Sequence, residues 1–135
     1  MSNQLPFVLH VDDDDDIRAV ALIALETVGG LTVEQFDSGG AALEGVKKLK
    51  PDLFLLDVMM PGMNGMETLE RLRAMPQFSS TPAVFMTAKV QESDVRQLLA
   101  CGALDVIAKP FDPMTLASEV VSIWQRATGG PENTE

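Results

Sequence analysis

The chain has 135 residues, of which 46% are hydrophobic and 22% are charged, so it has the length and composition of one folded domain. Its formal net charge of −10 argues against direct binding of nucleic acid, and no apolar stretch approaches the roughly 20 residues of a membrane-spanning helix. With a single cysteine, Cys101, and no signal-peptide pattern at the N-terminus, we expect a cytoplasmic protein without an internal disulfide bond.

Two strands and two helices are predicted at the start of the chain. Short apolar runs predict strands over 7–11 and 31–36. Between these runs, apolar residues recur at spacings of three and four, as in an amphipathic helix: Ile17, Val20, Ala21, Ala24 and Val28. Acidic residues stand at the start of this helix, and Gly29-Gly30 ends it. Ser38 can cap a second helix, which ends before Pro51.

The third predicted strand is the most informative stretch of the chain. Leu53-Phe54-Leu55-Leu56 is apolar without interruption, which indicates a central parallel strand that is buried on both faces. The run leads directly into Asp57, and Pro61-Gly62 then turns the chain. A carboxylate at the C-terminal end of such a strand stands where open α/β sheets bind their ligands.

The second half of the chain continues the alternation of helix and strand. Strands are predicted over 82–86, ending at Thr87, and over 104–108, followed by Lys109. Helices are predicted from three sets of periodic apolar residues: Met66, Leu69 and Leu72; Val95, Leu98 and Leu99; and Leu116, Val120 and Ile123. Five strands that alternate with five helices predict an α/β fold, in which helices cover both faces of a parallel sheet.

Polar residues follow four of the predicted strands, namely Asp12, Asp13, Asp57, Thr87 and Lys109. In a parallel sheet these strand ends share one edge, so the side chains can converge. Three carboxylates would repel one another by several kcal/mol at an effective dielectric constant of about 20, and a divalent cation and a lysine relieve that repulsion. Mg²⁺ prefers such hard oxygen ligands. Asp57 is then a candidate nucleophile toward phosphorus, with Lys109 and Thr87 holding the phosphoryl oxygens.

Over residues 5–127 the chain resembles the receiver domains of two-component response regulators, in particular the single-domain type found in chemotaxis. The matching stretches are Val11-Asp12-Asp13 with Ile17-Arg18, Asp57-Val58-Met59-Met60-Pro61-Gly62-Met63-Asn64-Gly65, Met86-Thr87-Ala88, Gly102-Ala103, and Lys109-Pro110-Phe111. The resemblance implies a flavodoxin-like (βα)5 fold with strand order 2-1-3-4-5. Residues 128–135 are then a short polar tail.

The resemblance also implies a role for each residue of the predicted site. Asp57 accepts a phosphoryl group from a sensor histidine kinase or a histidine phosphotransfer protein. Mg²⁺, or Mn²⁺, is coordinated by Asp12, Asp13, Asp57 and the backbone carbonyl of Met59. Thr87, Ala88 and Lys109 bind the phosphoryl group and carry the switch, and a cis peptide bond precedes Pro110. The switch then changes the binding of a downstream protein that the sequence does not identify.

Three positions bear on how this chain differs from its family. In strand 5 the family usually carries an aromatic residue three positions before the lysine, whereas this chain carries Val106. We therefore expect the signal to be transmitted by the loop after Thr87 rather than by rotation of an aromatic ring. Met59 and Lys89 occupy the positions that flank the path of the attacking water in the family, so we expect them to tune self-dephosphorylation.

Two other classes of function are considered beside the phosphorylated switch. One is a Mg²⁺-dependent phosphohydrolase that forms an aspartyl phosphate, because Asp12-x-Asp14 loosely matches the motif of that class. The chain offers no cap domain and no late acidic pair for such an enzyme. The other is an unphosphorylated docking module, which predicts that the nucleophile, the metal-binding acids or the lysine is missing. All of them are present, so we expect a switch and not an enzyme in the usual sense.

Overall fold

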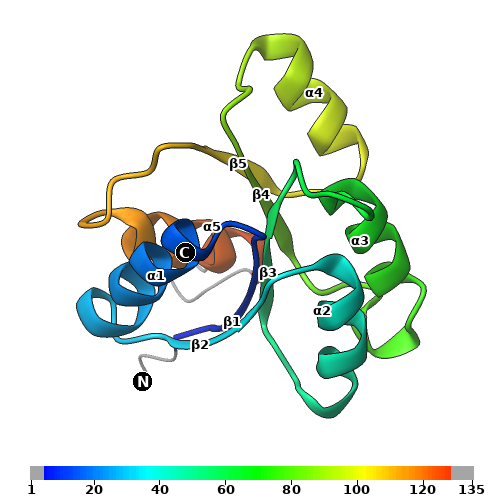
Figure 1. The fold of residues 1–135 in the computed structure, drawn as a ribbon, viewed down its shortest axis with the longest axis horizontal. Helices are drawn as coiled ribbons and strands as arrows, with labels where there is room; N and C mark the ends of the chain where they lie inside the picture. Colours follow the sequence, from blue (N-terminus) through cyan, green and yellow to red (C-terminus); the bar gives the residue numbers. More distant parts are fainter. Residues whose placement is uncertain (1–4, 129–135) are drawn as a thin grey trace, which may run out of the picture.

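The computed structural model describes residues 5–128, which form a five-stranded parallel sheet in the order β2-β1-β3-β4-β5 (Figure 1). The strands are β1 (Phe7–Val11), β2 (Thr32–Phe36), β3 (Leu53–Asp57), β4 (Ala83–Thr87) and β5 (Asp105–Ala108). The predicted fold class and strand order are confirmed. All five residues of β3 are buried, as the uninterrupted apolar run predicts for a strand with neighbours on both sides.

Five α-helices alternate with the strands: α1 (Asp15–Leu22), α2 (Gly39–Gly45), α3 (Gly65–Arg73), α4 (Glu92–Ala100) and α5 (Leu116–Thr128). A π-helical segment, η1 (Ile23–Val28), continues α1, and short 3-10 segments, η2 (Val46–Lys48) and η3 (Pro76–Phe78), follow α2 and α3. Apolar spacing alone does not distinguish a π turn from an α turn, so η1 was not predicted. The last helix, α5, ends at Thr128, and the domain boundary after residue 127 stays a prediction. Residues 129–135 of the predicted tail lie outside the described part.

Side-chain caps fix where the first three helices begin. Asp14 accepts hydrogen bonds from the backbone N–H groups of Asp16 and Ile17 at the start of α1. Ser38 caps α2 as predicted, and Asn64 forms a capping box with Glu67 at the start of α3. Each cap stands between the end of one strand and the start of the next helix, in a loop at the carboxyl edge of the sheet.

The sheet separates two apolar cores. On one face, α1, η1 and α5 cover residues such as Val8, Leu55 and Ile107. On the other face, α2 and α3 cover residues that include Leu9 and Phe54. Leu98 is the buried residue of α4, which stands away from the rest of the molecule in Figure 1. No helix within residues 5–128 is long and apolar enough to cross a membrane.

Candidate functional site

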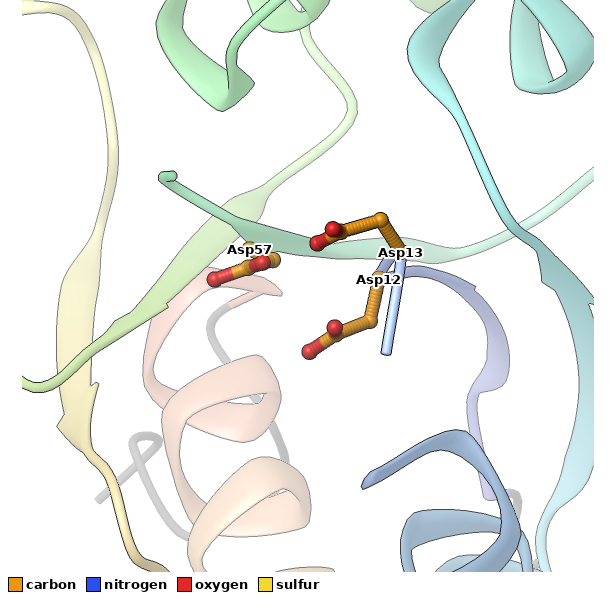
Figure 2. A group of neighbouring side chains, drawn as sticks. All are labelled: Asp12, Asp13 and Asp57. Atoms are coloured by element: carbon orange, nitrogen blue, oxygen red, sulfur yellow. The ribbon is translucent and has the colours of Figure 1, made fainter. Parts of the chain in front are cut away.

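Two adjacent strands bring the predicted acids together. Asp57 ends β3 and is only 4% exposed, and Asp12, which follows β1, is fully buried. Asp13 is exposed at the rim. Because β1 and β3 are paired, one oxygen from each of the three carboxylates lies within 4.8 Å of the others, as Figure 2 illustrates. The three acids therefore form one acidic pocket at the carboxyl edge of the sheet.

Lys109 supplies the positive charge of this pocket. Its Nζ lies 2.8 Å from Asp57 Oδ1 and 3.0 Å from Asp12 Oδ2, and its side chain is 15% exposed. The backbone N–H of Lys109 donates to the carbonyl of Thr87 at 2.9 Å, which extends the pairing of β4 and β5 up to the site. The Lys109–Pro110 peptide bond is cis.

The charges in the pocket are not balanced. Burial raises the pKa of Asp57 to about 6; the hydrogen bond from Lys109 opposes this rise, and the nearby charges of Asp12 and Asp13 add to it. Burial disfavours the charged form of Lys109, but hydrogen bonds to Asp57 and Asp12 and their charges outweigh it and raise the pKa of the ammonium group. One lysine therefore faces three acids, and an added cation would lower their mutual repulsion.

A close approach of α3 shapes the loop after Asp57. The backbone N–H of Gly65 donates to the carbonyl of Val58 at 2.9 Å. A Cβ atom on Gly65 would lie 2.2 Å from the carbonyl oxygen of Asp57, so this position accepts no side chain without displacement of the backbone. Gly62, with φ of +76°, turns the loop. The loop leaves the side chain of Met59 62% exposed beside the acidic pocket.

Thr87 and Lys89 lie on the opposite side of the pocket from β1. Thr87 is 2% exposed, and its Oγ1 accepts a hydrogen bond from the backbone N–H of Lys89 at 3.1 Å. A cavity of about 170 Å³ separates this loop from α4, and Met59, Thr87, Lys89 and Leu98 are among its lining residues. Met59 and Lys89, the positions predicted to tune dephosphorylation, thus share one cavity with the threonine.

Val106 sits in β5, one strand away from the acids. Its side chain is half-buried and packs against the core on the side of α2 and α3. It pairs in register with Phe85 of β4, two residues before Thr87. A valine at this position fills less space than the aromatic residue that the family usually carries there.

The sequence analysis named Arg18 only within a matching stretch and did not predict that its side chain contacts the backbone of Asp12. Its Nη1 donates to the backbone carbonyl of Asp12 at 2.7 Å, and its Nη2 pairs with Asp15. The backbone N–H of Asp14 donates to Asp12 Oδ1 at 2.9 Å. A long cationic side chain in the second turn of a helix that follows an acidic strand end is the sequence signal that could have indicated this contact.

A family model described as the response regulator receiver domain matches residues 8–121. The chain belongs to this family. The transcriptional regulatory protein CseB of Streptomyces coelicolor is 36% identical over 130 residues, which are 95% of this chain and 54% of that protein. The DNA-binding response regulator MtrA of Mycobacterium tuberculosis is 43% identical over 84% of this chain and 48% of its own length. The chain thus spans about half the length of the curated relatives it matches.

Solved receiver structures agree with the fold. Chemotaxis protein CheY4 of Vibrio cholerae superposes with a TM-score of 0.82 at 31% identity, covering 89% of this chain and 99% of that one. A response regulator of Chloroflexus aurantiacus, described as putative, gives a TM-score of 0.82 at 32% identity over 91% of this chain and 100% of its own. The sequence matches and the superpositions therefore agree that the chain is a response regulator receiver domain.

Proposed function

We propose that Asp57 is the phosphoacceptor and that it takes its phosphoryl group from a phosphohistidine on a sensor histidine kinase or a histidine phosphotransfer protein. The observation that carries the proposal is the position of its carboxylate: it ends the buried central strand, 2.8 Å from Lys109 and within 4.8 Å of the other two acids. An oxygen of Asp57 attacks phosphorus, the new P–O bond forms, and the P–N bond to the imidazole breaks.

Asp12, Asp13, Asp57 and the carbonyl of Met59 are the groups proposed to hold Mg²⁺, or Mn²⁺. The donor set fits, because carboxylate and carbonyl oxygens are the hard ligands that Mg²⁺ prefers. The geometry also fits, because the three carboxylates converge within 4.8 Å and the nearby positive charge is that of Lys109. When bound, the cation would neutralise charge on the incoming phosphoryl group.

The remaining residues of the site are proposed to bind the phosphoryl oxygens. Lys109 already contacts the carboxylate that would carry the group, so its ammonium can pair with a phosphoryl oxygen after transfer. Thr87 is the last residue of β4 and Ala88 follows it, so the hydroxyl of Thr87 and the backbone N–H of Ala88 lie at the same edge of the sheet. If Thr87 turns toward the phosphoryl group, it gives up the hydrogen bond that it accepts from Lys89. That exchange would move the loop against α4 and switch the binding of a downstream protein.

The wider proposal follows from these roles. Residues 5–127 act as a phosphorylated switch in the cytoplasm, and the chain assists its own phosphorylation and dephosphorylation without turning over a separate substrate. Kinase, phosphotransfer protein and downstream partner are all proteins in this scheme, with no nucleic acid or membrane contacted by the domain itself.

Labelling with a small phosphodonor tests the proposal. Incubation with acetyl phosphate and Mg²⁺ should add one phosphoryl group per chain, measured by intact-mass spectrometry, and removing Mg²⁺ with a chelator should abolish it. Asp57→Asn should abolish labelling as well, while Asp52→Asn, at the opposite edge of the sheet, serves as the matched control. Full labelling of Asp57→Asn would refute the assignment. Sustained hydrolysis of an aryl phosphate would favour the phosphohydrolase, and absence of labelling in the wild type would favour the docking module.

A further inference from the structure

A series of hydrogen bonds runs behind Asp12, from the edge strand β2 through α1. The side-chain amide nitrogen of Gln35 lies 3.0 Å from His10 Nδ1 and donates to the carbonyl oxygen of Arg18 at 2.9 Å. Arg18 in turn donates from Nη1 to the backbone carbonyl of Asp12 at 2.7 Å. These contacts connect β2, β1 and α1 at the point where the chain enters the acidic pocket.

His10 fixes the orientation of Gln35. The two residues are register partners in the pairing of β1 with β2, and His10 is fully buried. An amide nitrogen can only donate, so Nδ1 accepts the hydrogen bond. The Gln35 amide nitrogen therefore donates one hydrogen bond to Nδ1 of His10 and the other to the carbonyl oxygen of Arg18.

Asp12 has hydrogen-bond partners at its backbone N–H, its carbonyl and Oδ1, whereas Oδ2 is buried with only the ammonium group of Lys109 nearby. Its backbone N–H donates to the carbonyl of Phe36 at 3.1 Å, next to Gln35 on β2. Its carbonyl accepts from Arg18, Oδ1 accepts from the N–H of Asp14 at 2.9 Å, and Oδ2 faces Lys109 at 3.0 Å. Arg18, whose side chain is 20% exposed, is anchored at its other guanidinium nitrogen by Asp15. The backbone from which the Asp12 carboxylate projects is therefore attached to α1 through the guanidinium group of Arg18.

We propose that Gln35 is a positioning residue for the carboxylate of Asp12, acting through Arg18 with His10 as its second anchor. The inference deepens the proposed function, because it rests on Asp12 as a ligand of Mg²⁺. Partners that orient metal ligands typically change metal affinity by about 10- to 100-fold when removed. Gln35 is two hydrogen bonds away from Asp12, so its removal should weaken Mg²⁺ binding by roughly three- to tenfold.

Gln35→Leu is the direct test, because leucine has a similar size and no charge. The dissociation constant for Mg²⁺ is measured by calorimetry on the full chain at pH 7, and we expect it to rise. Gln77→Leu, on the exposed surface of η3, is the matched control and should bind as the wild type does. An unchanged dissociation constant in a folded Gln35→Leu protein would overturn the inference.

Two further variants separate positioning from simple loss of structure. His10→Val combined with Gln35→Leu removes both partners of the buried pair, so Nδ1 of His10 is not left without its partner, and the protein should stay folded with weakened Mg²⁺ binding. Arg18→Lys keeps the positive charge but removes the planar guanidinium group. In that background, Gln35→Leu should change the dissociation constant for Mg²⁺ little further. Full additivity of the two changes would overturn the route through Arg18.

A spectroscopic readout makes the test independent of phosphorylation. The side-chain amide resonances of Gln35 should shift during a Mg²⁺ titration with the same midpoint as the backbone amide of Asp13, while those of Gln77 should not move. Stationary Gln35 resonances would overturn the inference. A wild type that binds no Mg²⁺ at millimolar concentration would instead overturn the proposed metal site, and this inference with it, so the two failures are distinguishable.

Discussion

Charged side chains have different partners at the two edges of the sheet. At the amino edge, Arg73 of α3 donates to the backbone carbonyls of Phe78, Thr81 and Gly102, and the Asp52 carboxylate accepts from the backbone N–H of Phe7 at 2.8 Å. Each of these charges thus meets a neutral backbone group. At the carboxyl edge, three carboxylates face one another and a single lysine.

The charged side chains of the amino edge therefore serve stability, and those of the carboxyl edge serve binding. The amino edge uses its charges to fix loops, so removing one should cost stability and leave binding unchanged. The carboxyl edge keeps acids that repel one another, so removing one should cost binding while the ligand-free domain stays as stable or gains stability. Functional sites are where a protein tolerates such unfavourable contacts.

Arg73→Met gives the largest expected effect and tests the amino edge. Three carbonyls lose their donor, and burial lowers the pKa of this guanidinium, which shows that it is partly desolvated. We expect the free energy of unfolding to fall by about 2–3 kcal/mol, measured by urea denaturation. Mg²⁺ affinity should stay within a factor of about two. Arg71→Met, on the exposed face of α3, is the control; an equal loss there would mean that the carbonyl contacts contribute nothing specific.

Asp13→Ala tests the opposite edge. It removes an exposed acid that repels Asp57, so the free energy of unfolding without Mg²⁺ should stay level or rise. The dissociation constant for Mg²⁺ should rise by at least roughly tenfold in calorimetry, because a direct ligand is lost. Asp16→Ala removes the same charge from the exposed start of α1 and should have a smaller effect. A large drop in the melting temperature of ligand-free Asp13→Ala would contradict the contrast between the edges.

The pH dependence of stability sharpens the contrast further. The pKa of Asp57 is raised to about 6 in the folded state, so its protonation favours folding; the contribution is complete below about pH 3.8 and is lost as pH rises through 6. Relative to Asp57→Asn, the wild type without Mg²⁺ should therefore lose on the order of 1–3 kcal/mol between pH 4 and pH 7.

His10 does not disturb this comparison. Its lowered pKa, about 4, contributes stability at neutral pH that is lost as pH falls, but the contribution is the same in both proteins and cancels in the difference. Denaturation in the presence of a chelator measures the effect. A difference in the free energy of unfolding that is flat with pH would show that Asp57 titrates normally.

The carboxyl edge was the more predictable of the two from sequence. An uninterrupted apolar run ending in Asp57, and polar residues directly after three other strands, are local signals that a parallel sheet brings together. The contacts of Arg73 and the pairing of His10 with Gln35 depend on strand register and on loops distant in sequence, which periodicity does not encode. In the same way, no local pattern distinguishes exposed Met59 from its buried neighbour Met60.

The exposed rim of the carboxyl edge should set the lifetime of the phosphoryl group. Met59 cannot orient a water molecule by hydrogen bonding, and Lys89 can pair with the phosphoryl oxygens and cover them. We predict that Met59→Asn and Lys89→Glu each speed loss of the phosphoryl group by roughly two- to tenfold, followed by intact mass after removal of acetyl phosphate. Met114→Asn, which changes another exposed methionine on the loop before α5, is the control. Unchanged decay in both variants would count against the prediction.

The smallest expected effect is a shift of the loop after Thr87 and of α4 at the carboxyl edge of the sheet. The amino edge should not move. Thr87 Oγ1 is bonded to the backbone N–H of Lys89, and Leu98 is the buried residue of α4, so little apolar contact resists a shift of this loop and helix. Val106 is short and β-branched, so it cannot report the switch by ring rotation.

We therefore expect that beryllium fluoride, a phosphoryl mimic, added with Mg²⁺ changes amide chemical shifts from Ala88 to Ser93 and at the start of α4. Amides near Arg73 and Thr81, at the amino edge, should stay unchanged and serve as the internal control. Val106→Tyr should extend the shifts along β5, because the larger ring couples that strand to Thr87. Shifts confined to Asp57 through Gly65 would show that the loop after Thr87 does not transmit the signal.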